Sequence, residues 1–255
     1  MKVLIFGSII LGSSLAFSSP VVEVYDRFEM NWGSLRVKFF GESRSDGANQ
    51  AGYQEKQQMA WGDGLAYVSN KISDVRKTKE CWDTGIEPEK NEAERAFDGV
   101  SKSTYSTLTT YFGEGSIRIQ MESSLTKALF PAAVDLDNSE PGSTEGVKHT
   151  GVILEISEKK QVSPCPTYTL VDESGEVLFD SKRVWKAVFE KNFMARWYQK
   201  PSKNEVRRYV GDNPLKIPVT VDDRGRFSID RVVWEQVLVG NEPLLSGAKV
   251  LIASP

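Results

Sequence analysis

The first eighteen residues constrain this chain most, because they determine which part of it folds and in which compartment. Lys2 is followed by the apolar stretch 3–17, which only glycine and serine interrupt. A positive charge, a short apolar core and small residues at its end are the three parts of a secretory signal peptide. Small side chains at Ala16 and at Ser18 give two options for cleavage. We therefore expect residues 1–18 to be a signal peptide and the remainder to fold after export.

An uncleaved membrane anchor is the alternative interpretation of this leader. Its uninterrupted apolar run is shorter than the roughly 20 residues that a spanning helix needs, and no strong block of charge follows it. No cysteine stands at the cleavage site, so the pattern differs from that of a conventional lipoprotein. The sequence thus predicts an exported protein that is periplasmic or associated with the outer membrane.

The charge of the mature chain is close to balanced. Without Lys2 it has 31 basic and 35 acidic residues, a net charge of −4. This balance gives no general attraction for nucleic acid, and export makes nucleic acid an unexpected partner. About 237 residues remain after cleavage, enough to bury a sizeable core as one large domain or two small ones.

Two cysteines, Cys81 and Cys165, remain in the mature chain. In an oxidising compartment a lone pair of thiols often forms one disulfide, which is the pairing that we predict. Two unconnected thiols are the alternative, because a disulfide requires Cα atoms within about 7 Å of each other.

The N-terminal half, residues 19–136, reads as an α+β unit. Alternating apolar and charged residues predict strands over 34–40 and 115–122. A helix is expected over 48–75, with one apolar face spaced at four, three, four and three residues. That face consists of Trp61, Leu65, Val68, Ile72 and Val75.

Small residues mark a second feature of this helix. Ala60, Gly64 and Ala66 leave a shallow surface on which a neighbouring backbone can pack closely. We expect it to contact the protein's own sheet, with a subunit contact as the alternative.

The second half, residues 150–255, reads as β-rich with two helices. A linker or long loop at 137–149 precedes it, rich in turn-forming residues. Alternation and turn signals predict strands over 152–156, 215–220, 226–229 and 248–252, a hairpin of 168–171 and 177–179 around the turn 172–175, and helices over 181–199 and 230–239. Strands and helices mix without regular βαβ alternation, which favours the α+β class.

Residues that carry chemistry are sparse. His149 is the single histidine and sits in a polar loop, which argues against a histidine-based triad or a histidine-rich metal site. No glycine-rich phosphate-binding loop is present. Asp222 with Asp223, and Asp135 with Asp137, are better explained as turn residues than as acid–base pairs. We therefore predict no catalytic residue, no cofactor and no metal site.

The stretch 182–209 has the most unusual composition, with nine basic residues and interleaved aromatic residues. One interpretation is an exposed basic, aromatic helix that lies on an anionic membrane surface or stacks on nucleic acid bases or sugar rings, of which export makes nucleic acid unexpected. The other is an amphipathic helix whose aromatic face packs on the sheet. The candidate interaction residues are Trp185, Phe189, Arg196, Trp197 and Tyr198.

Several segments of this chain resemble a family of exported bacterial envelope proteins related to the flagellum-associated outer-membrane lipoprotein FlgP. The sharpest likeness lies in the second half, where 149–155 is similar to the family's YTG strand and 170–177 to its DEDGREVY hairpin. Residues 210–215 (VGDNPL) are similar to a segment before the family's last strand pair. In the first half, the strand ending in Gly41 and the long helix after it also resemble the family.

This resemblance implies a strand–long helix–strand–strand core of the dodecin type and an envelope location. It further implies a role in the assembly or support of large structures such as the flagellar basal apparatus, often through oligomerisation. This chain lacks the lipidated cysteine of the lipoprotein members.

We therefore expect a non-enzymatic structural or assembly protein whose partners are itself, envelope or flagellar proteins, and no nucleic acid. The alternative is a module that binds glycan or peptidoglycan through Trp185, Trp197 and Tyr198. A hydrolase whose carboxylates cluster in a deep pocket is a third hypothesis.

Overall fold

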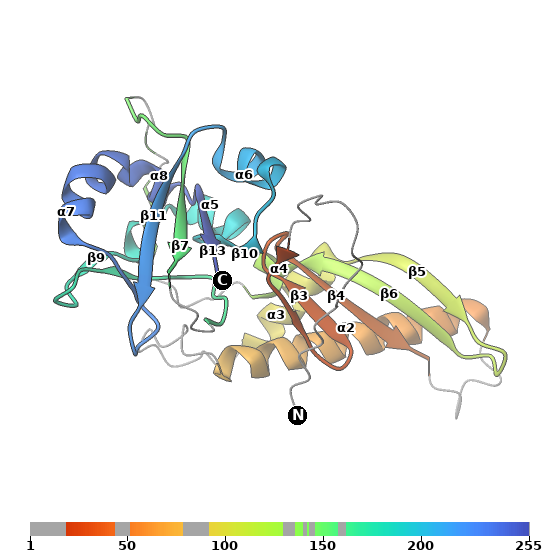
Figure 1. Ribbon diagram of the computed structural model, residues 1–255. Coiled ribbons are helices and arrows are strands. Elements are labelled where there is room, and N and C mark those ends of the chain that lie inside the picture. Colours follow the sequence, from red (N-terminus) through yellow and green to blue (C-terminus); the bar gives the residue numbers. More distant parts are fainter. Residues whose placement is uncertain are drawn as a thin grey trace.

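The computed structural model describes residues 19–43, 52–78, 92–129, 136–139, 142, 146–157 and 162–254 (Figure 1). They form an α+β structure, as the sequence predicts, and its strands make two β-sheets. A three-strand unit leads into a long helix, and a β-rich part follows. The signal peptide predicted for residues 1–18 and the cysteine at position 81 lie outside the described residues. The disulfide with Cys165 therefore stays a prediction.

The first sheet is antiparallel and has five strands, in the order β2-β3-β4-β6-β5. Buried and less buried residues alternate along β4 and β6, so this sheet has one covered face and one open face. Its strands are β2 (Val22–Val24), β3 (Phe28–Asn31), β4 (Arg36–Glu42), β5 (Tyr105–Tyr111) and β6 (Ile117–Ser124). The sequence predicted β4 and β6 but not β2, β3 or β5.

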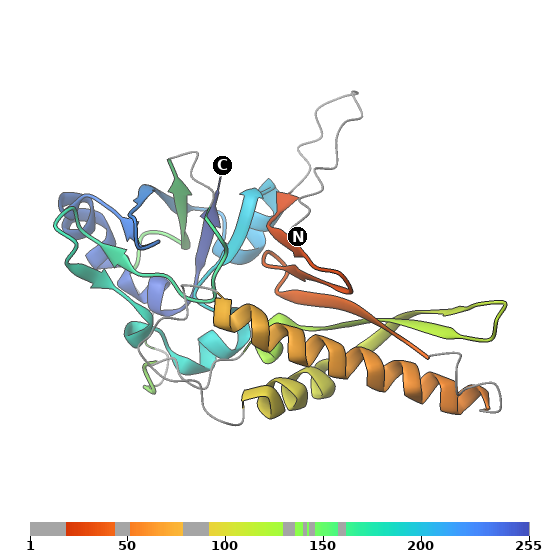
Figure 2. The same ribbon diagram turned by 90° about the horizontal axis from the view of Figure 1, so that it is seen from below.

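Two helices cover one face of this sheet, as Figure 2 shows: α2 (Tyr53–Thr78) and α3 (Glu92–Ser103). Leu65, Val68, Ile72 and Val75 of α2 are buried, and Trp61 packs against the same core. The predicted apolar helix face is therefore confirmed. A further short helix, α4 (Leu125–Ala128), follows β6.

The closest approach between α2 and its sheet occurs at two glycines. A Cβ atom on Gly41 of β4 would lie 1.9 Å from the Ala60 carbonyl oxygen and 2.5 Å from the Gly64 nitrogen. A Cβ atom on Gly64 would lie 2.3 Å from the Met121 side chain. Ala60 and Gly64 therefore pack on the protein's own sheet, which confirms the favoured interpretation for these two residues. Ala66 is exposed, so the prediction was wrong for this third residue.

The second sheet has eight strands, in the order β1-β10-β13-β7-β11-β12-β8-β9. Its centre is parallel, because β10, β13, β7 and β11 all run in the same direction. The strands are β1 (Ser19–Pro20), β7 (Gly151–Ile156), β8 (Leu170–Val171), β9 (Val177–Phe179), β10 (Arg196–Lys200), β11 (Pro214–Val221), β12 (Phe227–Ser228) and β13 (Val250–Ala253).

Short helices surround this sheet. They are η2 (Ser181–Arg183), α5 (Lys186–Asn192), α6 (Lys203–Val210), α7 (Arg231–Val233), the π-helical turn η3 (Trp234–Leu238), η4 (Val239–Asn241) and α8 (Glu242–Ser246). Asp230 caps α7, since its carboxylate accepts a hydrogen bond from the Val232 nitrogen at 2.6 Å. None of the described helices combines the length and the hydropathy that a membrane span requires.

The single helix predicted over 181–199 is wrong. The chain forms η2 and α5, and then Phe193 adopts a left-handed backbone (φ 55°) that ends the helix. Residues 196–200 form β10, which pairs in parallel with β13. The predicted helix is thus present only as η2 and α5, and the buried position of β10 in the sheet decides the conformation of the residues that follow.

The N-terminal residues join the two sheets. β1 pairs with β10 of the large sheet. β2 begins two residues after the end of β1 and pairs with β3 of the small sheet. Trp32 lies at this junction, fully buried, with its ring 6.2 Å from that of Phe193. Its backbone carbonyl accepts a hydrogen bond from the Trp197 nitrogen at 3.4 Å. The junction is therefore built from segments far apart in the sequence.

The predicted β8–β9 hairpin is confirmed, and an aspartate organises its turn. The Asp172 carboxylate accepts hydrogen bonds from the Ser174 hydroxyl at 2.6 Å and from the Glu176 nitrogen at 2.9 Å. Arg231 donates to the same carboxylate at 2.9 Å. These contacts, led by that of Ser174, hold the pKa of Asp172 at about 2, below its usual 3.8.

This low pKa predicts an acid-sensitive contribution to stability. A carboxylate with a depressed folded-state pKa stabilises the fold above its ordinary pKa, and the contribution is lost as the pH falls toward the folded-state value. We expect Asp172→Asn to lower the urea midpoint at neutral pH, with the difference from wild type shrinking between about pH 5 and about pH 2. Ser174→Ala should give the same trend more weakly. A difference that does not change with pH would contradict this account.

Candidate assembly surface

The structure buries most of the predicted interaction residues. Phe189 has no exposed surface, and Trp197 and Tyr198 are each 2% exposed. Their rings lie within the two core clusters, so they contribute to the fold. Trp185 and Arg196 are partly exposed. The described structure thus matches the interpretation in which the aromatic residues of this stretch pack on the sheet.

Arg196 contributes to the sheet junction. Its guanidinium donates to the Gly33 carbonyl at 2.9 Å and to the Asn192 side chain at 3.1 Å. It also lies 4.1 Å from the centre of the Tyr209 ring, a cation–π distance. Burial lowers the pKa of Arg196 and is the largest influence on it. This residue therefore holds protein segments together.

A different part of the molecule is exposed and distinctive. The β5–β6 hairpin and the start of α2 project away from the rest of the protein in both Figure 1 and Figure 2. We call residues 52–59 and 105–118 the arm. Residues 52–59 are exposed or half-buried, and the first fully buried residue of α2 is Ala60.

Side chains tie the two parts of the arm together. The Tyr53 and Tyr111 rings stack with centroids 5.1 Å apart, although each residue is about half exposed. The Lys56 ammonium donates to the Gly115 carbonyl at 3.0 Å. Gly115 has a φ of 84° in the hairpin turn, a left-handed conformation that favours glycine. The helix start and the hairpin tip therefore form one structural element.

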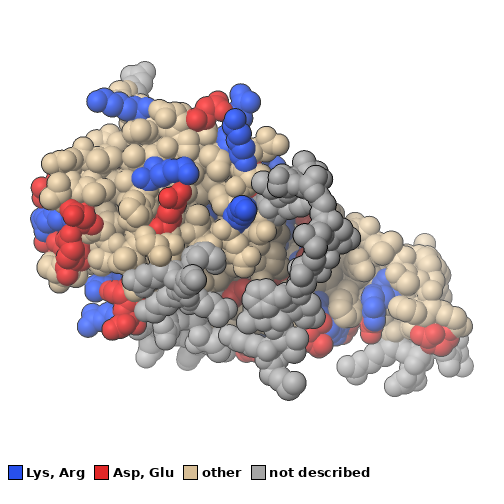
Figure 3. All heavy atoms as spheres, in the orientation of Figure 1, with Lys and Arg blue, Asp and Glu red and all other residues tan. Residues whose placement is uncertain are grey.

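Strand β5 forms an edge of the five-stranded sheet. None of its seven residues is buried, and Tyr105, Leu108 and Tyr111 are 46%, 52% and 51% exposed. It contains no charged residue and no proline. Edge strands usually carry such residues because their unpaired backbone groups can pair with another chain. Figure 3 shows the side of the arm along β5 as uncharged surface.

The open face of the sheet beside β5 carries paired charges. Lys38 lies 3.5 Å from Glu29, and Arg36 lies 3.5 Å from Glu122. The Tyr105 hydroxyl donates to Glu122 at 2.8 Å, and this hydrogen bond is the main cause that raises the pKa of Tyr105. β5, which has no charged residue, therefore lies along the edge of a face that carries paired charges.

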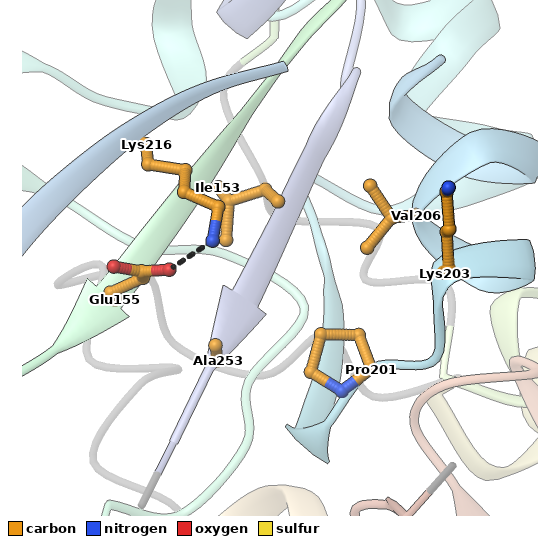
Figure 4. A pocket seen from close by; sticks show the side chains of 7 residues that line it. All are labelled: Ile153, Glu155, Pro201, Lys203, Val206, Lys216 and Ala253. Atoms are coloured by element: carbon orange, nitrogen blue, oxygen red, sulfur yellow. Dashed lines mark ion pairs between the residues drawn. The ribbon is translucent and has the colours of Figure 1, made fainter. Parts of the chain in front are cut away.

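A shallow hollow lies over the large sheet beside α6 (Figure 4). Its volume is about 320 Å³, and its walls combine apolar and basic side chains. Glu155 is the one carboxylate among the described residues that line it, and it pairs with Lys216 at 3.2 Å. The lining residues are Ile153, Glu155, Pro201, Lys203, Val206, Lys216 and Ala253. This hollow lacks the clustered carboxylates that the hydrolase hypothesis requires.

No protein-family model matches the chain, and no curated protein matches it either.

β5, the strand along the edge of the arm, was not predicted from the sequence. Five of the seven residues of β5 are tyrosine or threonine, both of which favour strands, so composition could have located this strand. Its edge position has no local signal, because it depends on which strands flank β6 in the folded sheet.

Proposed function

We propose that this protein is a non-enzymatic structural or assembly component of a bacterial cell envelope, exported to the periplasm or the outer-membrane surface. The exposed, uncharged edge strand on a projecting arm carries the proposal. A strand of this kind provides backbone groups and apolar surface for a protein partner.

The resemblance to the FlgP-related family adds to this proposal. The order strand, long helix, strand, strand of the dodecin type has a counterpart in β4, α2, β5 and β6. Here α3 lies between the helix and β5, and β2 and β3 precede the unit. We propose that the flagellar basal apparatus is the assembly that this protein serves.

The glycan-binding alternative has less support. Trp197 and Tyr198, two of its three aromatic residues, are buried, and a sugar ring needs an exposed aromatic face for stacking. Trp185 alone remains partly exposed among the three.

Fractionation of native envelopes tests the proposal. We expect the protein to co-sediment with flagellar basal bodies, at a mass far above its own 28.5 kDa. It should leave that fraction when basal-body formation is blocked. Recovery only as a monomer in the periplasmic fraction would contradict the proposal.

A further inference from the structure

We infer that β5 pairs antiparallel with β5 of a second copy of this chain, joining two five-stranded sheets into one across a two-fold axis at Leu108. This inference rests on the proposed assembly function and specifies the contact through which copies meet. Three observations support it: β5 is an open edge strand, the faces of its residues are arranged symmetrically about Leu108, and the arm projects from the rest of the protein.

The edge is open and long enough to pair. β5 has seven residues, whereas β2, at the other edge of this sheet, has three. No described segment covers the outer side of β5, since all of its residues are exposed or half-buried. An uncovered strand with strand-favouring residues and no charge is the kind that accepts another strand.

A bulge makes the faces of β5 symmetric. The register against β6 shifts between Ser106 and Leu108, so Thr107 lies outside the ladder. Tyr105, Leu108 and Thr110 pair with polar residues of β6 and so lie on its open face. Ser106 and Thr109 pair with Met121 and Ile119 and so lie on the face toward α2.

The ladder residues 105, 106, 108, 109 and 110 therefore alternate between faces symmetrically about Leu108. Directly opposite residues in an antiparallel pair share a face. Centring the contact on Leu108 satisfies this condition at these five positions, because Ser106 then meets Thr109 of the second copy and Tyr105 meets Thr110. Tyr111, the last ladder residue of β5, lies beyond the contact. A two-fold contact of this type is self-complementary and closes as a dimer.

Charges on the open face suit the same arrangement. Tyr105 shares its row of the sheet with Glu122, and Thr110 shares its row with Arg118. When Tyr105 of one copy meets Thr110 of the other, Glu122 of one sheet and Arg118 of the other become the nearest charges on the two sides of this pair, with Lys38 and Glu42 one strand further in. Opposite charges therefore flank the contact at both ends.

The shape of the arm favours antiparallel pairing. β5 begins near the large sheet and runs outward to the tip of the arm (Figure 1). In an antiparallel pair, the tip of each arm lies beside the start of β5 in the other copy. The two large sheets therefore lie at opposite ends of the dimer. Parallel strands would bring both large sheets to the same end.

Cross-linking of the purified mature chain tests the register. Opposite residues in antiparallel strands have Cα atoms about 4.5–5.5 Å apart, within the range of a disulfide. We expect Leu108→Cys to form a covalent dimer on oxidation. Ser106→Cys and Thr109→Cys should each stay monomeric but cross-link when mixed. Val24→Cys, exposed on β2 at the other edge, is the control that should not cross-link.

A charged residue at the two-fold axis tests whether the β5 contact determines the affinity of the dimer. Leu108→Lys places two like charges opposite each other, and we expect it to raise the dimer dissociation constant at least about tenfold. Val24→Lys should leave that constant unchanged. Circular dichroism checks that both variants fold, and cross-linking decides the question if Leu108→Lys does not.

The results that would contradict the β5 contact differ from those that would contradict the proposed function. No Leu108→Cys dimer above the Val24→Cys level, or a dimer that Leu108→Lys leaves intact, would overturn the β5 contact. Co-sedimentation with basal bodies would then still support an assembly role through another surface. Absence from every envelope assembly would instead remove the proposed function.

Discussion

Gly41→Ala is expected to destabilise the protein by about 3 kcal/mol, measured as a lower urea unfolding midpoint. The new methyl group would lie 1.9 Å from the Ala60 carbonyl oxygen. Backbone atoms of α2 cannot move away as a flexible side chain can, so the helix must shift from the sheet. That shift would loosen the core beneath α2.

A second glycine in α2 provides a matched control. A Cβ atom on Gly62 would meet no heavy atom within 4 Å, and this residue is exposed in the helix. Gly62→Ala should therefore stabilise the protein by about 1 kcal/mol, because alanine favours a helix over glycine. Equal effects of the two substitutions would contradict the proposed packing of α2 on β4.

Trp32→Ala is expected to cost about 4 kcal/mol of unfolding free energy. The Trp32 side chain is fully buried where the two sheets meet, and its indole nitrogen donates to Glu23 at 2.9 Å. Truncation leaves a cavity beside Phe193 and removes this hydrogen bond. The two sheets would therefore lose their shared packing.

A graded series separates packing from hydrogen bonding at this site. Trp32→Phe retains most of the ring contact and should cost about 1–2 kcal/mol. Phe97→Ala, at a position that is 44% exposed, should change the unfolding free energy by less than about 1 kcal/mol. If Trp32→Ala has an effect as small as that of Phe97→Ala, the junction does not connect the sheets as described.

Local patterns predicted the elements whose signals are complete within a few residues. The alternation along β4 and the aspartate turn between β8 and β9 are examples, since strand faces and turn chemistry are local properties. In β7 the expected alternation is absent, because this strand lies in the middle of the large sheet and Ile153 is buried as well. The apolar face of α2 was also predicted correctly from the local spacing of its residues. Gly64 indicated a close approach, although its partner Gly41 lies on a strand far away in the sequence.

Other features depend on the whole fold. The stretch from Arg196 onward looks helical by composition, yet it pairs with β13, more than 50 residues later in the chain. Burial of Trp197 and Tyr198 follows from that pairing, so sequence reasoning misplaced the interaction surface. The edge position of β5 likewise depends on the order in which strands assemble around β6.

The mass of the purified mature chain, measured by sedimentation over a concentration series, tests the central claim most directly. We expect a species of twice the monomer mass, with Leu108→Lys shifting the population to the monomer and Val24→Lys leaving it unchanged. A wild-type chain that remains monomeric at every concentration would contradict assembly through the arm.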